Sequence, residues 1–262
     1  MTSLDLLRAD NLDHPQLVHA FTTRKGGVSQ GAYASLNLTR SRGDDAAHVA
    51  ENRTRLKRAM DLDHLAFATQ VHGKQVIRVD GPPRGDQPVG EGDAMITDKT
   101  GLGLCCQTAD CTSILLFDPV NLAIAAIHSG WRSTVLNIIG ETISAMGTAY
   151  GTRPADLIAA IGPSISAVHY RVGPEVVAEV EAVFGDDEVI LSTRDDDGGA
   201  QLDVGAACLR QLIDKGVAES RIERSPLCTY GEPDLLFSAR RSHHQGQSGI
   251  FGGQVGVIGL LG

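Results

Sequence analysis

The sequence of 262 residues predicts a mixed α+β sandwich, because many short β-prone runs and four helical patterns follow one another without regular alternation. No Gly-rich dinucleotide fingerprint follows a strand and no phosphate-binding Gly-x-x-x-x-Gly-Lys motif occurs, which disfavours a doubly wound nucleotide-binding fold. The β-prone runs are 17–23, 65–72, 75–79, 102–106, 113–118, 122–128, 157–161, 188–191 and 254–260.

Four helices are predicted by apolar residues at helical spacing, which begin after Asp45, Ser133, Pro174 and Asp203. Asp45, Ser133 and Asp203 are expected to be N-caps, because their side-chain oxygens can accept hydrogen bonds from the free N–H groups of a first turn. Pro174 suits the first helical position, where no N–H donor is needed.

The composition is that of an ordinary globular chain, with 42% hydrophobic and 21% charged residues and a net charge of −9. The acidic balance and the absence of a Lys/Arg cluster count against nucleic acid and anionic membranes as partners. The N-terminal residues contain no apolar stretch long enough for a signal peptide or a membrane span, so a cytoplasmic location is expected. Candidate site residues lie on both sides of the Gly- and Pro-rich stretch 80–92, so we expect a single domain over residues 1–262.

Three side chains with metal-binding or nucleophilic chemistry, His72, Cys111 and His128, each lie at an end of a β-prone run beside a turn. Two imidazoles and one thiolate suit zinc, with copper as a competitor, and leave a fourth position for water or substrate. Their spacing matches no local metal-binding motif, and each residue could instead be buried filler. A second interpretation makes Cys111 the nucleophile of a cysteine hydrolase, with His128 or His72 as its base and Asp110 nearby.

Two segments could bind an anion or a base. After His128 the chain runs through glycine into a predicted helix, where free N–H groups and the Arg132 guanidinium suit phosphate. Near the N-terminus, a glycine turn separates Arg24 from Asn37, and both side chains could contact phosphate or base. The alternatives are a plain helix cap with a solvated Arg132 and a hairpin with a solvated tip.

Taken together, the ordered motifs QVHG, TADC and HSGWR, with TTRKGGVS, ASLN, IGP and a late Arg pair, resemble the bacterial laccase-domain family. That family was first labelled polyphenol oxidase and is now regarded as purine nucleoside phosphorylase. The resemblance implies a catalytic zinc held by His72, Cys111 and His128. It also implies a mixed β-sandwich core flanked by helices on both faces, a four-layer αββα arrangement.

The activity that the resemblance implies is phosphorolysis of adenosine, inosine and methylthioadenosine to a free base and ribose 1-phosphate or its methylthio analogue, with adenosine deaminase side activity. A metal-bound hydroxide could attack C6 of adenine, and phosphate held by Arg132 or Arg24 could attack the anomeric carbon. The expected partners are purine nucleosides and phosphate, for a monomer or a homodimer. The expected catalytic residues are Cys111, Arg24 and Arg132, and the expected substrate-binding residues are Asn37, Gln70, Asp110 and Arg240.

Other functions stay open at this stage. Nine histidines without any His-x-His pair argue against a multicopper cluster, although a copper-dependent polyphenol oxidase could use the same three ligands. A Cys111-based hydrolase or amidase that edits cell-wall precursors and a non-catalytic zinc-stabilised binding protein are the further alternatives. The chain departs from the family pattern at Ser164 and His169, where cysteines are common, and at Ala239, where a tyrosine is usual. The preferred nucleoside is therefore undecided.

Overall fold

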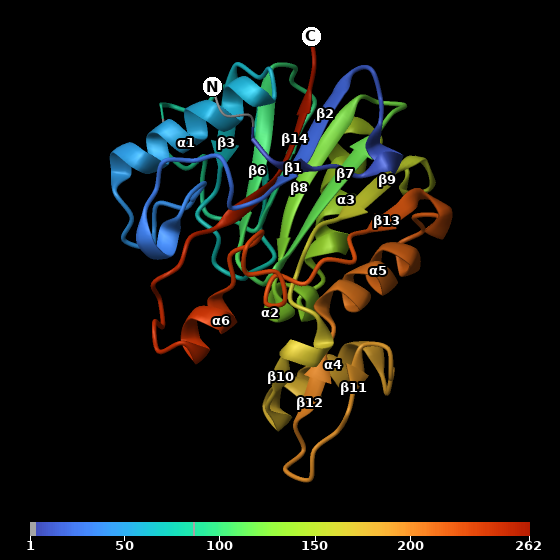
Figure 1. The fold of residues 1–262 in the computed structure, drawn as a ribbon. Coiled ribbons are helices and arrows are strands. Elements are labelled where there is room, and N and C mark those ends of the chain that lie inside the picture. The colour runs from blue at the N-terminus through green and yellow to red at the C-terminus, as the bar shows by residue number, and fades with distance from the viewer. Residues whose placement is uncertain (1–3, 86) are drawn as a thin grey trace.

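Two large β-sheets stack face to face in the computed structural model, which describes residues 4–85 and 87–262 (Figure 1). The five-stranded sheet has the order β1 (Leu6–Leu7), β2 (Leu17–Thr22), β14 (Gln254–Leu260), β6 (Leu102–Thr108) and β3 (His64–Phe67). The six-stranded sheet has the order β13 (Ile222–Arg224), β9 (Ile158–Ile161), β7 (Thr112–Asp118), β8 (Ala123–Ser129), β5 (Ala94–Thr97) and β4 (Val76–Arg78).

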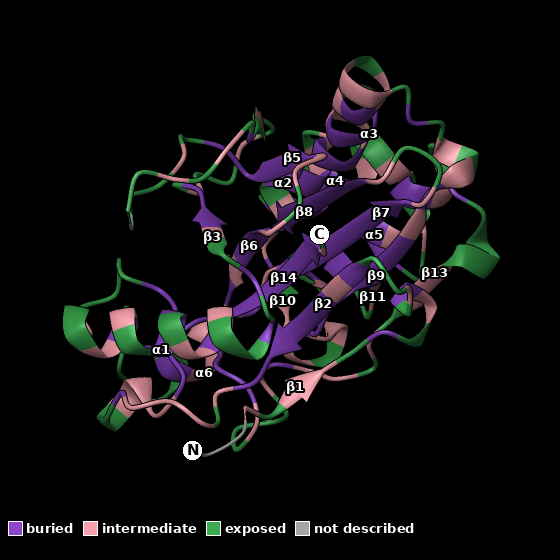
Figure 2. Ribbon diagram, turned by 90° about the horizontal axis from the view of Figure 1, so that it is seen from above, coloured by how far each residue is buried: buried purple, intermediate pink, exposed green. Residues whose placement is uncertain are grey.

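The apolar layer between the sheets forms because successive side chains of a strand point to opposite faces. Leu115 and Phe117 of β7 point inward and pack in one buried cluster with Leu104 of β6. Ile114 and Leu116, on the alternate positions of β7, belong to the cluster on the outer face of the same sheet. The central strands are therefore buried on both faces, as the purple strands of Figure 2 show.

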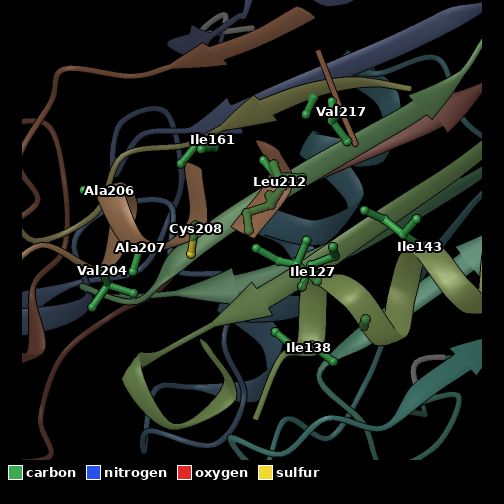
Figure 3. Packing of buried hydrophobic residues seen from close by; sticks show 14 of the residues in the cluster. Ile127, Ile138, Ile143, Ile161, Val204, Ala206, Ala207, Cys208, Leu212 and Val217 are labelled. Atoms are coloured by element: carbon green, nitrogen blue, oxygen red, sulfur yellow. The ribbon is translucent and has the colours of Figure 1, made fainter. Parts of the chain in front are cut away.

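Helices cover the outer face of each sheet. Helix α1 (Ala46–Ala59) packs Leu56 against the cluster on the five-stranded sheet. Helices α3 (Ile138–Tyr150) and α5 (Val204–Asp214) cover the six-stranded sheet, where Ile143 and Leu212 gather around Ile127 of β8 (Figure 3). This arrangement confirms the α+β prediction and gives the expected order of four layers, αββα.

A small third sheet lies at one end of the molecule (Figure 1). It has the order β10 (Arg171–Val172), β12 (Ala200–Leu202) and β11 (Leu191–Ser192), and helix α4 (Pro174–Phe184) lies beside it. The β-prone run 188–191 therefore contributes only its last residue to a strand. No helix in the described part of the chain is long and apolar enough to cross a membrane.

The helix-start predictions were confirmed in three cases and wrong in one. Asp45 and Asp203 cap α1 and α5 through side-chain hydrogen bonds, and Pro174 occupies the first turn of α4. Ser133 is not an N-cap, because helix α2 (Trp131–Val135) already begins after Gly130. A left-handed residue, Asn137 (φ 64°), then separates α2 from α3.

Two features that matter for the site were not predicted. Strand β3 ends at Phe67 instead of continuing to residue 72, and the following loop carries His72. A short helix, α6 (Ala239–His244), contains the late Arg pair, and its first turn is capped by the Ser238 side chain.

Candidate active site

His72, Cys111 and His128 lie together at one edge of the sandwich. Their ligand atoms are all within 4.8 Å of one another. His128 is near the end of β8, Cys111 directly precedes β7, and the antiparallel pairing of these two strands places both residues at the same sheet edge. His72 approaches from the loop after β3, and its Nε2 lies 3.8 Å from the Cys111 Sγ.

The orientation of His128 is fixed by a buried carboxylate, Asp93. The His128 Nδ1 lies 2.8 Å from the Asp93 Oδ1, and the backbone N–H of His128 donates to the Asp93 carbonyl at 2.7 Å. Both side chains are buried, and a metal-bound histidine commonly donates its other ring N–H to a carboxylate in this way. The contact therefore leaves Nε2 of His128 as the atom available to a metal.

The same carboxylate holds the loop that carries His72. It accepts hydrogen bonds from the backbone N–H groups of Val71, His72 and Gly73 at 3.2, 2.9 and 2.7 Å. Burial disfavours the ionised form of Asp93, but the hydrogen bonds from His128 and Gly73 outweigh it and hold the pKa of Asp93 below its ordinary value. One ionised side chain thus positions two of the three candidate ligands.

The electrostatics of the cluster favour a thiolate beside a charged imidazole when no metal is bound. Burial raises the pKa of Cys111, but His128 and His72 outweigh burial and lower it to about 6. Burial lowers the pKa of His128, but the Cys111 thiolate and Asp93 raise it to about 9. A thiolate is the form of cysteine that binds metal and attacks electrophiles, so the cluster suits both kinds of chemistry.

The donor set fits a zinc ion. Typical distances of about 2.3 Å for Zn–S and about 2.0 to 2.1 Å for Zn–N, at a tetrahedral angle, separate sulfur and nitrogen by about 3.6 Å. The separation of 3.8 Å between Cys111 Sγ and His72 Nε2 is close to that value. The His72 and His128 rings are nearly perpendicular, with centroids 4.7 Å apart. Three protein ligands would leave one tetrahedral position open, as in catalytic zinc sites.

Gly130 allows the chain to pass close to this cluster. A Cβ atom at this position would lie 3.0 Å from both the Cys111 Sγ and the His72 Cδ2. The glycine of the HSGWR motif therefore allows close packing against two candidate ligands, and it is also the N-cap of helix α2.

A cavity of about 480 Å³ opens beside the cluster and is large enough for a small-molecule ligand. His72, Cys111 and His128 line one part of it. Arginines and aromatic rings line another part, where the Arg42 guanidinium lies 4.6 Å from the Phe251 ring centroid. Other lining residues are Arg40, Arg53, Phe67, Gln70, Gln87, Gln107, Thr108, Gly252 and Gly253.

Gln70 and Asn37, which we expected to bind substrate, are both held by the backbone. Gln70 lines the cavity, but its amide accepts from the N–H of Gln107 and donates to the carbonyl of the same residue. Asn37 is completely buried, and its amide oxygen accepts from the N–H groups of Thr39 and Gly253. These contacts give both side chains a role in shaping the cavity wall.

Arg24 and Asp110 also make extensive contacts within the protein. The Arg24 guanidinium donates to the carbonyls of Ala34 and Pro233 at 2.7 Å each, and Arg24 does not line the cavity. The Asp110 carboxylate accepts from the Thr229 hydroxyl at 2.6 Å and from the N–H of Arg240 at 2.7 Å. Asp110 therefore joins the Cys111 segment to the start of α6.

Arg132 and Arg240 are not among the residues that line the cavity. Arg132 is exposed, with its guanidinium 4.4 Å from the Trp131 ring centroid. Arg240 lies over the Tyr170 ring at 4.9 Å. Burial and the negative charge of Cys111 raise the pKa of Tyr170 to about 12, although the cationic charges of Arg240 and Arg132 oppose this shift. The charges of both arginines therefore act on Tyr170, which the charge of Cys111 also affects.

Sequence reasoning missed Asp93 and the cavity arginines. Asp93 directly precedes β5, a strand that we did not predict, and an aspartate in a glycine-rich stretch is typical of an ordinary turn. Its position between two candidate ligands in the sequence was the available signal. The cavity arginines follow the ASLN motif as Arg40 and Arg42, but nothing local indicates that they line the same cavity as His72.

The chain is similar over almost its whole length to proteins of one family. Residues 18–260 match the family described as multi-copper polyphenol oxidoreductase laccase. A protein of Deinococcus radiodurans named purine nucleoside phosphorylase is 43% identical over 218 residues, which cover 82% of this chain and 81% of that protein. A protein of the same name from Bacteroides thetaiotaomicron is 36% identical over 237 residues, 87% of each chain. The crystal structure of YlmD from Geobacillus stearothermophilus superposes with a TM-score of 0.91 at 30% identity and covers 100% of this chain and 98% of that one.

Proposed function

Because the chain belongs to the multi-copper polyphenol oxidoreductase laccase family, we propose that it is a zinc-dependent purine nucleoside phosphorylase. The proposal is carried by one observation: His72, Cys111 and His128 converge at the wall of a cavity of about 480 Å³. Relatives that are named purine nucleoside phosphorylase support the substrate class. The proposed substrates are adenosine, inosine and methylthioadenosine, together with phosphate.

His72, Cys111 and His128 would hold the zinc, with Asp93 positioning both histidines. Zinc would supply a Lewis acid and an activated water, which suits the deamination of adenosine as a side activity. Two nitrogens and a thiolate are also acceptable to copper, so a polyphenol oxidase that uses copper at these ligands is the alternative to be tested.

The cavity would bind the nucleoside. Phe67 and Phe251 line the cavity with the Arg53 and Arg42 guanidinium groups over their rings at 3.7 and 4.6 Å, so planar cations and aromatic edges would contact a purine. For phosphate we retain Arg132 as a proposed ligand, because its guanidinium is exposed and its charge acts on Tyr170, which the charge of Cys111 also affects. Arg24 is proposed to act by positioning, since two backbone carbonyls accept hydrogen bonds from its guanidinium.

The first experiment measures metal content by mass spectrometry and hypoxanthine release from inosine, with and without phosphate. We expect one zinc per chain and phosphate-dependent release in the wild type, and loss of both in Cys111→Ala. Cys228→Ser is the matched control, because Cys228 is also partly exposed but is outside the three-ligand cluster. A zinc-loaded protein that releases no hypoxanthine from inosine in the presence of phosphate would contradict the proposal.

A second candidate function rests on the lowered pKa of Cys111, which is typical of a nucleophilic cysteine. In a Cys111-based hydrolase or amidase, chelators would leave turnover intact and an alkylating agent would abolish it. In the phosphorylase, removal of zinc would abolish turnover, and re-addition would restore it. Assays of adenosine deamination and of phenol oxidation with added copper, on the same preparations, test the remaining activities.

A further inference from the structure

A second cysteine, Cys228, lies in a polar cluster outside the cavity. Its Sγ accepts hydrogen bonds from the Ser166 backbone N–H at 3.3 Å and from the Ser166 hydroxyl at 3.0 Å. The His169 Nδ1 lies 3.5 Å from the same sulfur and 3.4 Å from the Ser166 Oγ. The Cys228 thiol, the Ser166 hydroxyl and the His169 imidazole thus all contact one another, and the proposed function does not use them.

The His169 imidazole is held in place by stacking. The His169 ring packs on the Tyr230 ring with centroids 4.5 Å apart and an angle of 21° between the planes. The Tyr230 hydroxyl in turn lies 3.0 Å from the His244 Nδ1. A base is therefore kept within reach of the Cys228 thiol, which is the arrangement that activates a cysteine nucleophile.

Positive charge also lies close to the sulfur. The Arg241 guanidinium donates through Nη1 to the carbonyls of Thr229 and Tyr230, the two residues after Cys228. The two donors from Ser166 and the Arg241 guanidinium therefore lie around the same sulfur.

The other cysteines do not share these features. Cys105, Cys106 and Cys208 are buried, and burial raises the pKa of Cys105 to about 12 and that of Cys208 to about 11. Cys111 would be occupied by the zinc. Cys228 is partly exposed, so in the zinc-loaded protein it is the free thiol that a small reagent can reach.

We propose that Cys228 is a site of oxidation by hydrogen peroxide and small organic hydroperoxides, with His169 as its base. The sulfur attacks one peroxide oxygen, so that an S–O bond forms while the O–O bond breaks. Sulfur loses two electrons and the peroxide is reduced. The thiol proton passes through His169 to the departing oxygen, and a thiol and a hydroperoxide thus give a sulfenic acid and an alcohol, or water from hydrogen peroxide. A small oxidant is the suitable reagent because Cys228 does not line the cavity, and attack needs only access to the sulfur.

The test treats zinc-loaded full-length protein with hydrogen peroxide at pH 7 and traps sulfenic acid with a 1,3-diketone. Mass spectrometry of the peptides then gives the labelling rate of each cysteine, in native protein and in urea. We expect Cys228 to be labelled about tenfold faster in native protein than in the unfolded chain. A faster native rate is expected because the His169 base lies beside the Cys228 thiol only in the folded chain. A native rate equal to or below the unfolded rate would overturn the proposal.

Variants separate the role of His169 from simple exposure. His169→Ala is expected to reduce the native labelling rate of Cys228 to that of the unfolded chain, and Ser166→Ala to reduce it about threefold. His243→Ala is the matched control, because His243 is exposed and its Nδ1 lies beside Ser248. Fast labelling in a folded His169→Ala protein would overturn the assignment of the base. If a variant does not fold, the wild-type comparison of native and unfolded rates still decides whether Cys228 is activated.

Discussion

The two histidines of the candidate metal centre are held in opposite ways. His128 is buried in a central strand, and both its ring and its backbone N–H are bound to Asp93. His72 is exposed on a loop, has a left-handed backbone (φ 59°), and is bound to Asp93 only through its backbone. One ligand is therefore part of the core, and the other is attached to it by a hydrogen-bonded turn.

This difference shows how a rigid sandwich can carry a site with an open coordination position. A buried ligand with a fixed ring defines where the metal lies, because its rotamer is locked by packing and by a carboxylate. An exposed ligand closes the site without disturbing the core. We therefore expect a substitution of His128 to affect both protein stability and metal binding, and a substitution of His72 to affect metal binding alone.

The largest difference is expected between His128→Ala and His72→Ala in metal-free protein. His128→Ala leaves the Asp93 carboxylate buried without its imidazole partner and should destabilise the fold by about 3 kcal/mol. His72→Ala alters an exposed side chain and should change stability by less than about 0.5 kcal/mol. Urea unfolding measures both values, and both variants should lose zinc. Equal destabilisation of the two variants would show that His72 and His128 contribute equally to the stability of the fold.

Replacement of the positioning carboxylate should affect both ligands at once. Asp93→Asn keeps the size of the side chain but replaces an ionised acceptor, so zinc affinity is expected to fall about 10- to 100-fold. Competition with a chromophoric chelator measures the affinity. Asp98→Asn is the control, because Asp98 follows the same strand at its far end and pairs with Lys99. An unchanged affinity in Asp93→Asn would remove Asp93 from the metal site.

A smaller effect is expected from Gly130→Ala. The added Cβ would meet the Cys111 Sγ and the His72 Cδ2 at 3.0 Å, so the exposed His72 loop must shift by a few tenths of an ångström. We expect zinc affinity to fall severalfold with little change in stability. Gly147→Ala is the control, because its Cβ would meet only the Thr152 carbonyl at 3.4 Å. If Gly130→Ala lost stability but kept its zinc affinity, the added Cβ would be displacing core residues and not the His72 loop.

A separate, pH-dependent effect concerns His19, a buried histidine outside the metal centre. Its Nε2 accepts the Ala9 N–H, and burial together with the charge of Arg8 lowers its pKa to about 4. Between pH 6.5 and 4 the unfolded chain binds a proton that the native protein does not bind, so this contribution to stability falls as the pH falls. Urea unfolding of His19→Gln should show a shallower decline over that range. If the free energy of unfolding of His19→Gln fell with pH as steeply as that of the wild type, the acid sensitivity would belong to other groups.

The sequence predicted the three candidate ligands because each belongs to a motif, and it predicted two of the helix caps because Asp45 and Asp203 act on their own first turns. Ser133 failed as a cap because Gly130, which must pass close to Cys111, begins the helix earlier. Asp93 was missed because its partners are the His128 ring and a loop about 20 residues away. Interactions between distant segments leave no local pattern to recognise.

The sequence by itself determined the secondary structure that alternation and capping control, and it identified the residue types that can bind zinc. Only the tertiary structure decided which polar side chains face the cavity. Arg24, Asn37 and Asp110 are bound within the protein, while Arg42 lines the cavity with the candidate ligands. The physical reason is that packing between segments distant in the sequence fixes which side chains line the cavity and which are hydrogen-bonded inside the protein.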